Sequence, residues 1–365
     1  MRIKHFLILA AVAGMALSCI SNFEATPTQE RAIGFSTWSE VLTKAPMTAF
    51  ADGDAFAVYG FKWNAGPAGQ TNVFEGTSVS YDGSKWAYSP LRFFDGNFDD
   101  YSFFAVYPTG VLDAEANEND YAQRGLFVTN ELTYDGSNEQ LLVAQKTNVA
   151  KASYGDAVAL HFKHAGALVD IKFKKSSILE NAEVEVTSIA LSNIQTKGTF
   201  TVASYDGDNN PVGATVSGVT GLGWALAGTP VVNATPAAAP YLNNSGVSLA
   251  AGTGTTVGTA ADLITNLVVM PQVLTNGASA QTITLSYTIT TGTGGSAQTI
   301  TFIDKSFEIG AFDRTDNDTN TATFISNWMP GVHYTYYITI NANAIQFSAT
   351  IDDWTTDTGY HYLVD

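Results

Sequence analysis

The sequence predicts an all-β protein made of two antiparallel β-sandwich domains. Strand-length stretches follow one another at short spacing, with turn signals such as Asp-Gly between them, which is the pattern of sandwich folds. No stretch after residue 18 keeps a helical periodicity over three turns. Only 14% of residues are charged, 12% are aromatic and 32 are glycine, a composition that fits a β-rich protein with many turns and a filled core.

Individual strands are predicted from the alternation of apolar and polar residues. The clearest is 282–290, where four apolar side chains alternate with threonine and serine. Residues 72–80 and 86–88 are predicted to form a hairpin around an Asp-Gly turn. Residues 184–194 and 198–202 are expected to pair with each other. The other expected strands are 32–36, 55–63, 101–107, 140–145, 157–162, 166–173, 267–270, 332–340 and 344–351.

The first residues carry an export signal. Arg2 and Lys4 precede an apolar run at 6–17, which is typical of a secretory signal peptide. This run is shorter than the roughly 20 apolar residues that a membrane helix needs. It closes on Ser18 and Cys19, and Cys19 is the only cysteine in the chain. The composition therefore excludes a disulfide within the chain.

The segment that ends at Cys19 resembles the lipobox of bacterial lipoproteins. There the signal is removed and the new N-terminal cysteine carries lipid. The usual leucine stands three residues before the cysteine, whereas Leu17 stands two before it. An ordinary signal peptide that contains a cysteine by chance is the alternative interpretation. Because no other cysteine occurs in the chain, we favour lipid attachment, such as palmitate, at Cys19.

The net charge of −17 constrains the partners of the protein. An acidic surface repels nucleic acid and anionic lipid headgroups. We therefore predict no nucleic-acid partner, and a membrane attachment that depends on the lipid alone.

No catalytic constellation is apparent. His161 and His164 lie three residues apart on a predicted strand and at its end, so their side chains should point to different faces. Zinc-type spacing and a Gly-x-Ser-x-Gly motif are both missing from the sequence. Two acidic stretches, 206–210 and 313–318, offer oxygen ligands that suit calcium, but turn-forming Asp and Asn give the same appearance. We predict no enzymatic activity, no cofactor and no metal centre, and leave calcium binding in these loops open.

Eight short motifs follow one another along the chain after the signal peptide. They are TKA at 43–45, DGDAFAVYG at 52–60, WAYSP at 86–90, YSFFAVYP at 101–108, FKHAGALV at 162–169, VMPQ at 269–272, WMPGVHY at 328–334 and FSATIDDW at 347–354. Together they resemble the fimbrillin family, the lipoprotein precursors of type V pili. The resemblance implies two transthyretin-like sandwich domains in tandem and export to the outer membrane and cell surface. It also implies removal of an N-terminal strand by a trypsin-like protease, followed by polymerisation into a pilus that supports adhesion.

Two basic residues compete as the processing site. Lys44 occupies the Thr-basic-Ala position of the family, and Arg31 is the only arginine between Cys19 and Arg92. Cutting at Lys44 would release residues 33–35 and open a groove, whereas cutting at Arg31 would leave them attached. The sequence does not decide between them.

The far end of the chain is the expected donor for such a groove. Tyr360, Tyr362 and Val364 fall on one side of a possible strand within 355–365. Inserting this strand into the open groove of another subunit would give a head-to-tail contact that does not close, and hence a filament of pilin subunits. A last edge strand within its own domain is the alternative.

The predicted organisation is a signal peptide at 1–18, a tether with a removable strand at 19–45, and domains at 46–178 and 179–365. The alternative function is a monomeric surface lipoprotein that binds glycans, and a secreted hydrolase ranks last. The sequence predicts neither the receptor nor whether the subunit belongs to the shaft, tip or anchor.

Overall fold

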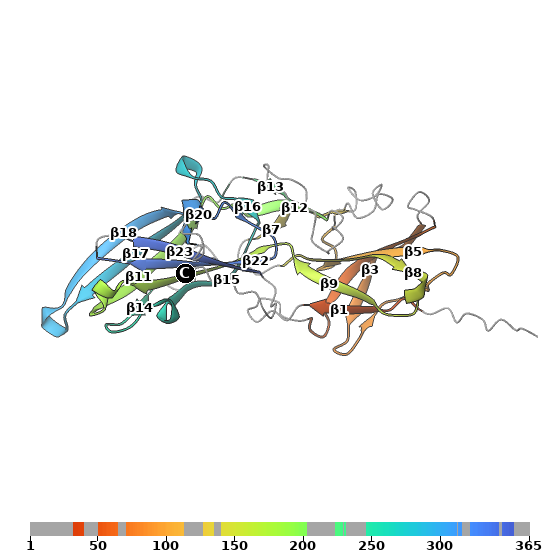
Figure 1. The fold of residues 1–365 in the computed structure, drawn as a ribbon, viewed down its shortest axis with the longest axis horizontal. Coiled ribbons are helices and arrows are strands. Elements are labelled where there is room, and N and C mark those ends of the chain that lie inside the picture. The colour runs from red at the N-terminus through yellow and green to blue at the C-terminus, as the bar shows by residue number, and fades with distance from the viewer. Residues whose placement is uncertain are drawn as a thin grey trace, which may run out of the picture.

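The computed structural model describes residues 32–39, 50–64, 71–112, 127–134, 140–202, 223–228, 230, 246–311, 313–315, 322–342 and 345–353. Within these residues the regular elements are β-strands and short 3-10 helices, arranged in an elongated molecule (Figure 1), which confirms the all-β prediction. The 3-10 helices are Lys151–Ser153, Ser177–Leu179, Val257–Thr259, Gly277–Ser279, Gly294–Ser296 and Ile309–Ala311. Over the described residues, no helix has the length and apolar character needed to span a membrane.

A seven-stranded sheet forms one end of the molecule. Its order is β1 (Phe35–Ser39), β9 (Val158–His164), β8 (Leu142–Ala150), β5 (Asp100–Tyr107), β2 (Ala55–Trp63), β3 (Thr71–Tyr81) and β4 (Trp86–Ala87). Strands β1 and β9 are parallel, and the other neighbours are antiparallel. The predicted hairpin of 72–80 and 86–88 is confirmed as β3 and β4, with Gly83 at φ 83° in the turn.

Both faces of this sheet are buried, as strand β2 illustrates. Phe56 and Val58 belong to a core cluster on one face, whereas Tyr59 and Phe61 belong to a second cluster on the other face. The register shifts next to Gly60, where a side chain would lie 2.8 Å from the ring of Phe74. Only glycine fits this close approach.

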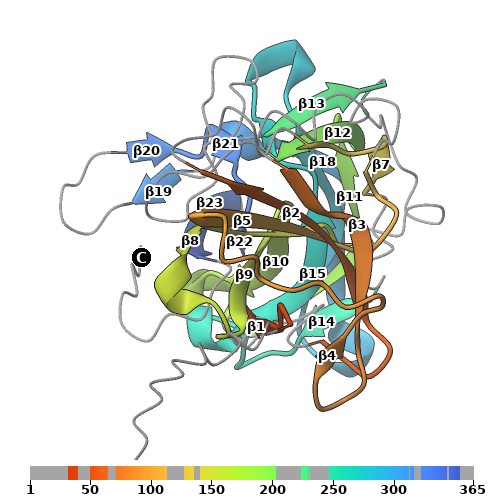
Figure 2. The ribbon, with the colours of Figure 1, turned by 90° about the vertical axis from the view of Figure 1, so that its right-hand side faces the viewer.

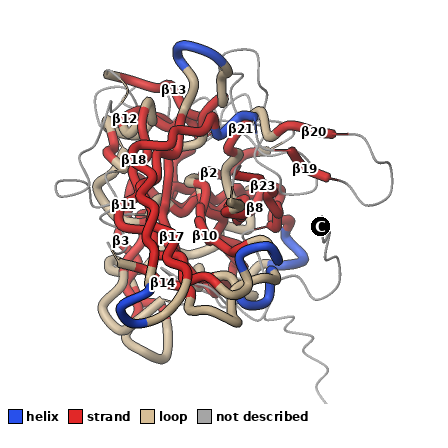
Figure 3. Tube along the Cα trace, turned by 90° about the vertical axis from the view of Figure 1, so that its left-hand side faces the viewer, coloured by secondary structure: helices blue, strands red, loops and turns tan. Residues whose placement is uncertain are grey.

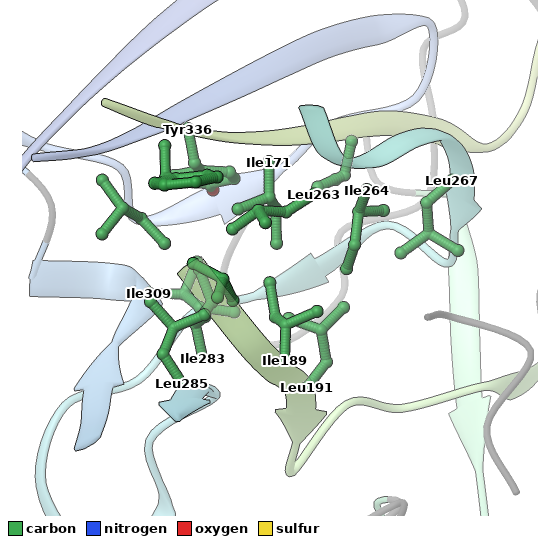
Figure 4. Close-up of a cluster of buried hydrophobic side chains, with 14 of the residues drawn as sticks. Ile171, Ile189, Leu191, Leu263, Ile264, Leu267, Ile283, Leu285, Ile309 and Tyr336 are labelled. Atoms are coloured by element: carbon green, nitrogen blue, oxygen red, sulfur yellow. The ribbon is translucent and has the colours of Figure 1, made fainter. Parts of the chain in front are cut away.

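Two four-stranded sheets pack face to face at the other end. One has the order β15 (Ala261–Val269), β10 (Ala167–Lys175), β22 (Val332–Ile340) and β23 (Ile345–Asp353). The other has the order β14 (Val247–Leu249), β11 (Ala182–Ser192), β17 (Thr282–Thr291) and β18 (Gln298–Glu308), and these strands lie side by side in Figure 3. Figure 4 shows Ile171, Ile264 and Tyr336 of the first sheet facing Ile189 and Leu285 of the second. This end is therefore a β-sandwich.

Smaller sheets lie between and beside these layers. Strand β12 (Lys197–Val202) pairs with β13 (Trp224–Ala227), β6 (Phe127–Val128) and β7 (Leu132–Thr133). Strand β16 (Gln272–Val273) pairs with β21 (Asn327–Trp328), and β19 (Asp313–Thr315) pairs with β20 (Ala322–Phe324). Phe200 and Trp224 pack in the same cluster as Tyr59, and the Trp224 indole donates a 2.7 Å hydrogen bond to the carbonyl oxygen of Ala165. Strands from the second half of the chain thus cover one face of the seven-stranded sheet.

The observed pairings differ from the expected ones in one place. The predicted pairing of 184–194 with 198–202 is wrong, because β11 pairs with β14 and β17, whereas β12 belongs to a separate sheet. Strand β10 pairs with β15 and β22, so residues 167–175 share a sheet with later strands. The division after residue 178 and the transthyretin-like assignment stay predictions.

Candidate functional site

The candidate site is the place that β1 occupies at the edge of the seven-stranded sheet (Figure 2). Strand β1 runs parallel to β9, from Phe35 opposite Val158 to Ser39 opposite Phe162. Just before the strand, the carbonyl oxygen of Gly34 accepts a 2.8 Å hydrogen bond from the N–H of Val158. One side of the segment is therefore joined to β9 by a continuous ladder.

The opposite side of the same segment is bound by residues 86–93. The N–H of Ile33 donates a 2.8 Å hydrogen bond to the carbonyl oxygen of Arg92, and Ala32 forms an antiparallel bridge with Phe93. The Tyr88 hydroxyl donates to the carbonyl oxygen of Ile33 at 2.7 Å. Residues 32–37 thus join the two edges of the curled sheet, β9 and the segment that begins with β4.

Aromatic side chains form a pocket around Phe35. The Phe35 side chain is only 8% exposed, and Ile33, two residues earlier, is 1% exposed. The ring centroid of Phe35 lies 5.5–6.2 Å from four other rings, each in edge-to-face geometry; these are Phe56, Phe74, Tyr88 and Phe103. Burying an apolar side chain of this size is worth about 1.5–3 kcal/mol. The segment therefore completes a core that the rest of the sheet leaves open.

Two polar contacts, one from Trp86 and one from Tyr88, fix the register of the segment. The indole Nε1 of Trp86 donates a 2.9 Å hydrogen bond to the hydroxyl of Thr37, and the hydroxyl of Tyr88 donates to the carbonyl oxygen of Ile33. Burial raises the pKa of the Tyr88 hydroxyl, although its hydrogen bond with the N–H of Arg92 acts the other way. Tyr88 is therefore protonated at neutral pH and can donate to Ile33. Trp86 belongs to β4, the strand that follows the Asp-Gly turn, and Tyr88 comes directly after this strand.

What the site can do follows from its backbone. Strand β1 pairs with β9 along one side, and residues 32 and 33 ahead of it pair with residues 92 and 93. The segment thus covers N–H and C=O groups of β9 that would be unpaired without it. Such an edge with a lined pocket is a template for another extended segment. Among the described residues, no group of three or more His, Cys, Asp or Glu side chains is placed to hold a metal ion.

The sequence located only part of this site. It pointed to the alternation at 32–36, and the structure assigns the strand to Phe35–Ser39, with Ile33 buried ahead of it. Thr37, Trp86 and Tyr88 were missed as site residues, although the spacing of Trp86 and Tyr88 places both side chains on one side of a strand. The predicted lipidation, processing and donor residues all lie outside the described residues; they are Cys19, Arg31, Lys44, Tyr360, Tyr362 and Val364.

Comparison with known families decides the relationship. A family model described as fimbrillin-like matches residues 43–354. The chain belongs to the fimbrillin-like family. The resemblance drawn from the sequence motifs is confirmed, and the family consists of fimbrial structural proteins rather than enzymes. Membership supports a role for this fimbrillin-like protein as a pilus subunit at the cell surface, in association with other pilins.

A solved structure of a fimbrial protein shares the fold of this fimbrillin-like protein. A fimbrial protein from Bacteroides vulgatus is 17% identical, with a TM-score of 0.57 over 89% of this chain and 100% of that one. The tip fimbrial protein Mfa3 from Porphyromonas gingivalis is 12% identical, with a TM-score of 0.43 over 89% of this chain and 100% of that one. At this identity the first likeness shows the fold alone, and the second is too distant to add to it. A search of curated proteins found no match.

Proposed function

We propose that this fimbrillin-like protein is a structural pilus subunit that polymerises when β1 is removed and another subunit's strand takes its place. The observation that carries the proposal is the seating of residues 32–37 between β9 and the 86–93 segment. The segment fills a pocket in the core but stands at the start of the described chain, ahead of Lys44. It can therefore be separated from the rest of the domain by one cut.

The position of β1 favours Lys44 over Arg31 as the productive cut. Strand β1 ends at Ser39, and the next strand, β2, begins at Ala55. A cut at Lys44 falls between them and leaves β1 held by non-covalent contacts alone. A cut at Arg31 would leave β1 connected to β2.

Covalent connection is what keeps such a short strand in place. Burial of Ile33 and Phe35 contributes about 3–6 kcal/mol together, and ordering the five residues of β1 costs a free energy of the same order. While the chain is intact, the strand binds within the molecule at a high effective concentration. After a cut at Lys44 that advantage is lost, so a competing strand can displace it.

The steps before polymerisation follow the sequence signals. We propose export as a lipoprotein, with lipid on Cys19 holding the precursor in the outer membrane until a trypsin-like protease releases it. The body would consist of two transthyretin-like domains, 46–178 and 179–365. Head-to-tail filling of one subunit's site by the next does not close, and so produces a filament.

Variants at the two basic residues test this proposal. Lys44→Gln should abolish the ladder of high-mass species on a non-boiled gel of surface protein, because β1 can no longer be cut free. Arg31→Gln is the matched control and should leave the ladder unchanged. A normal ladder from Lys44→Gln, or saturable sugar binding by a monomer in place of any ladder, would refute the proposal.

A further inference from the structure

We propose that β18 is a lateral contact between filaments, in which residues 298–302 of one subunit pair antiparallel with the same residues of a second copy of this chain. The two copies are related by a two-fold axis at Ile300. The inference rests on the pilus-subunit function proposed above and goes beyond head-to-tail assembly. It adds a side-by-side contact that uses neither β1 nor the site that β1 occupies.

Strand β18 is an open edge of the β-sandwich. It is the last strand of its sheet (Figure 1), and among the described residues it pairs with β17 alone. Its 11 residues make it the longest of the described strands that end a sheet. Residues 298–301 and 303–306 are all exposed, so no other part of the protein covers them. The N–H and C=O groups on its outer side are therefore accessible to another strand.

The two halves of β18 differ in their protection against pairing. The second half carries Asp304, Lys305 and Glu308, and its register shifts against β17. At the shift the Asp304 backbone has a φ of 50°, and its N–H donates a 3.1 Å hydrogen bond to the hydroxyl of Ser286. Charges and bulges of this kind keep edge strands from pairing. Residues 298–302 have no charge, proline or register shift, so the first half is the part that can accept a partner.

The lack of charge in this half bears on the choice of partner. The chain has a net charge of −17, so two copies repel each other over most of their surface. Like charges placed directly opposite each other destabilise a pair of strands. In the antiparallel register centred on Ile300, no charged residue lies opposite another within 298–302. Two copies of this acidic chain can therefore approach each other here.

The same residues also complement themselves in this register. On the inner face Ile289 of β17 lies opposite Ile300, so Ile300 of a second copy would continue an apolar row. On the outer face the hydroxyls of Thr290 and Thr299 are 2.9 Å apart. Thr301 of the second copy would lie opposite Thr299 and continue this row of hydroxyls. A slip by one residue would place the apolar row against the polar one, which disfavours other registers.

The size of the contact predicts where it forms. A pairing over 298–302 is short, and it buries less than the about 1,600 Å² of a standard interface. Single subunits should therefore not dimerise through this edge at low concentration. In a filament the edge repeats from subunit to subunit, so each contact holds the next pair at a high effective concentration. The second copy that we expect at β18 thus belongs to a neighbouring filament.

Single cysteines test the register. Ile300→Cys places a thiol on the two-fold axis, whereas Ile303→Cys places one on the same strand but outside the paired stretch. The two side chains are similarly exposed, at 61% and 67%. The parent chain, whose only cysteine is Cys19, gives the background. Filaments are collected from the cell surface, oxidised and boiled without reductant. Ile300→Cys should yield a disulfide-linked dimer, and Ile303→Cys should stay at the level of the parent.

The other outcomes of this experiment are distinct. A dimer from Ile303→Cys in place of Ile300→Cys would overturn the register. Monomers from both variants, in samples whose non-boiled ladder is normal, would overturn the lateral contact. An adduct of Ile300→Cys with a different protein would show that the partner is not a second copy. Loss of the non-boiled ladder from the parent would instead defeat the pilus-subunit function itself.

A charge at position 300 gives a second readout. Ile300→Lys sets two like charges opposite each other on the axis, so side-by-side bundles of filaments in electron micrographs should be lost. Ile303→Lys adds the same charge outside the paired stretch and should keep the bundles. Both variants should keep the non-boiled ladder, because the β1 site lies in a different sheet. Bundles that persist in Ile300→Lys would overturn the inference.

Discussion

The indole Nε1 of Trp86 donates a 2.9 Å hydrogen bond to the hydroxyl of Thr37, and so links two strands that are 49 positions apart in the sequence. This bond crosses from the strand after the Asp-Gly turn to the segment that we propose is removed. It is also the clearest polar determinant of which side chains the site accepts.

Loss of this acceptor should destabilise the uncut protein. Thr37→Val keeps the shape of the side chain but leaves the indole N–H unsatisfied, so the free energy of unfolding should fall by about 1 kcal/mol. Thr37→Ser retains a hydroxyl, so its free energy of unfolding should fall by much less. Urea unfolding of the three proteins measures this, and equal stability of Thr37→Val and the parent would rule out a contribution from the bond.

Phe35 should matter before processing and not after it. Phe35→Ala empties the aromatic pocket and should lower the stability of the uncut protein by about 3–5 kcal/mol. Ser36→Ala, at an exposed neighbouring position, should change it by less than about 0.5 kcal/mol. Subunits recovered from filaments of the parent protein, Phe35→Ala and Ser36→Ala should all show the same thermal stability, because the altered residue has been removed with β1. A difference that persists in the filament would mean that β1 stays in place.

Gly60 should resist substitution because of its surroundings. A Cβ atom there would lie 2.8 Å from Phe74 and 3.1 Å from Phe103, both buried. Gly60→Ala should therefore cost about 1–3 kcal/mol of stability. Gly96 is the matched control, because a Cβ atom built there would meet no atom of a non-neighbouring residue within 4 Å. If Gly60→Ala and Gly96→Ala unfold at the same urea concentration, the packing around β2 differs from that described.

The buried carboxylate of Asp170, in the β-sandwich end, should make the free energy of unfolding decrease at low pH. Burial alone would raise the pKa of Asp170, but the imidazole of His333 and the N–H of Asn266 lower it overall. The His333 Nε2 lies 3.1 Å from the carboxylate, outside the angle of an aligned hydrogen bond, and the Asn266 N–H donates at 2.7 Å. Because the folded pKa is below the unfolded one, the contribution of Asp170 is fully present above the unfolded pKa of about 3.9 and is lost as the pH falls through the folded pKa.

Asp170→Asn should therefore lower stability at neutral pH and flatten its decline below about pH 4. The size should be about 1.5–3 kcal/mol, as expected when the hydrogen bond from the Asn266 N–H to a charged acceptor is weakened. Asp262→Asn is the control, because Asp262 pairs with Lys172 but its side chain is 51% exposed, and exposed pairs contribute only about 0–1 kcal/mol. The free energy of unfolding of both variants should be measured between about pH 2.5 and 7. The same pH dependence for Asp170→Asn and Asp262→Asn would contradict this account.

Periodicity predicted the strands that have one buried and one open face. Residues 282–290 match β17 almost residue for residue, because its alternating burial reflects a sheet with one covered face. Residues 332–340 match β22, in which four consecutive residues from His333 to Tyr336 are buried. The sequence did not predict strand β18. Its apolar side chains are not the buried ones: Ile300 is 61% exposed and Ile303 is 67% exposed. It is an edge strand with a register shift near Asp304, whose φ is 50°. In the sequence, the alternation of polar and apolar residues covers only Thr299 to Phe302 and is broken by the adjacent Ile303.

The candidate site was harder to predict than the fold. The alternation of Ile33 and Phe35 marked a strand, but its partner, β9, begins at Val158, and pairing over that separation leaves no local pattern. The contact between Thr37 and Trp86 depends on the curl of the sheet, which brings its two edges together. The β3–β4 hairpin, in contrast, was predicted from its Asp-Gly turn, because both strands and the turn lie within one short stretch of sequence.

The most direct test of the account is the N-terminal sequence and intact mass of subunits taken from the cell surface, together with their size on a non-boiled gel. The account predicts an N-terminus at Ala45, with β1 absent, in a ladder of high-mass species. A lipidated Cys19 terminus on a protein that stays monomeric would contradict it.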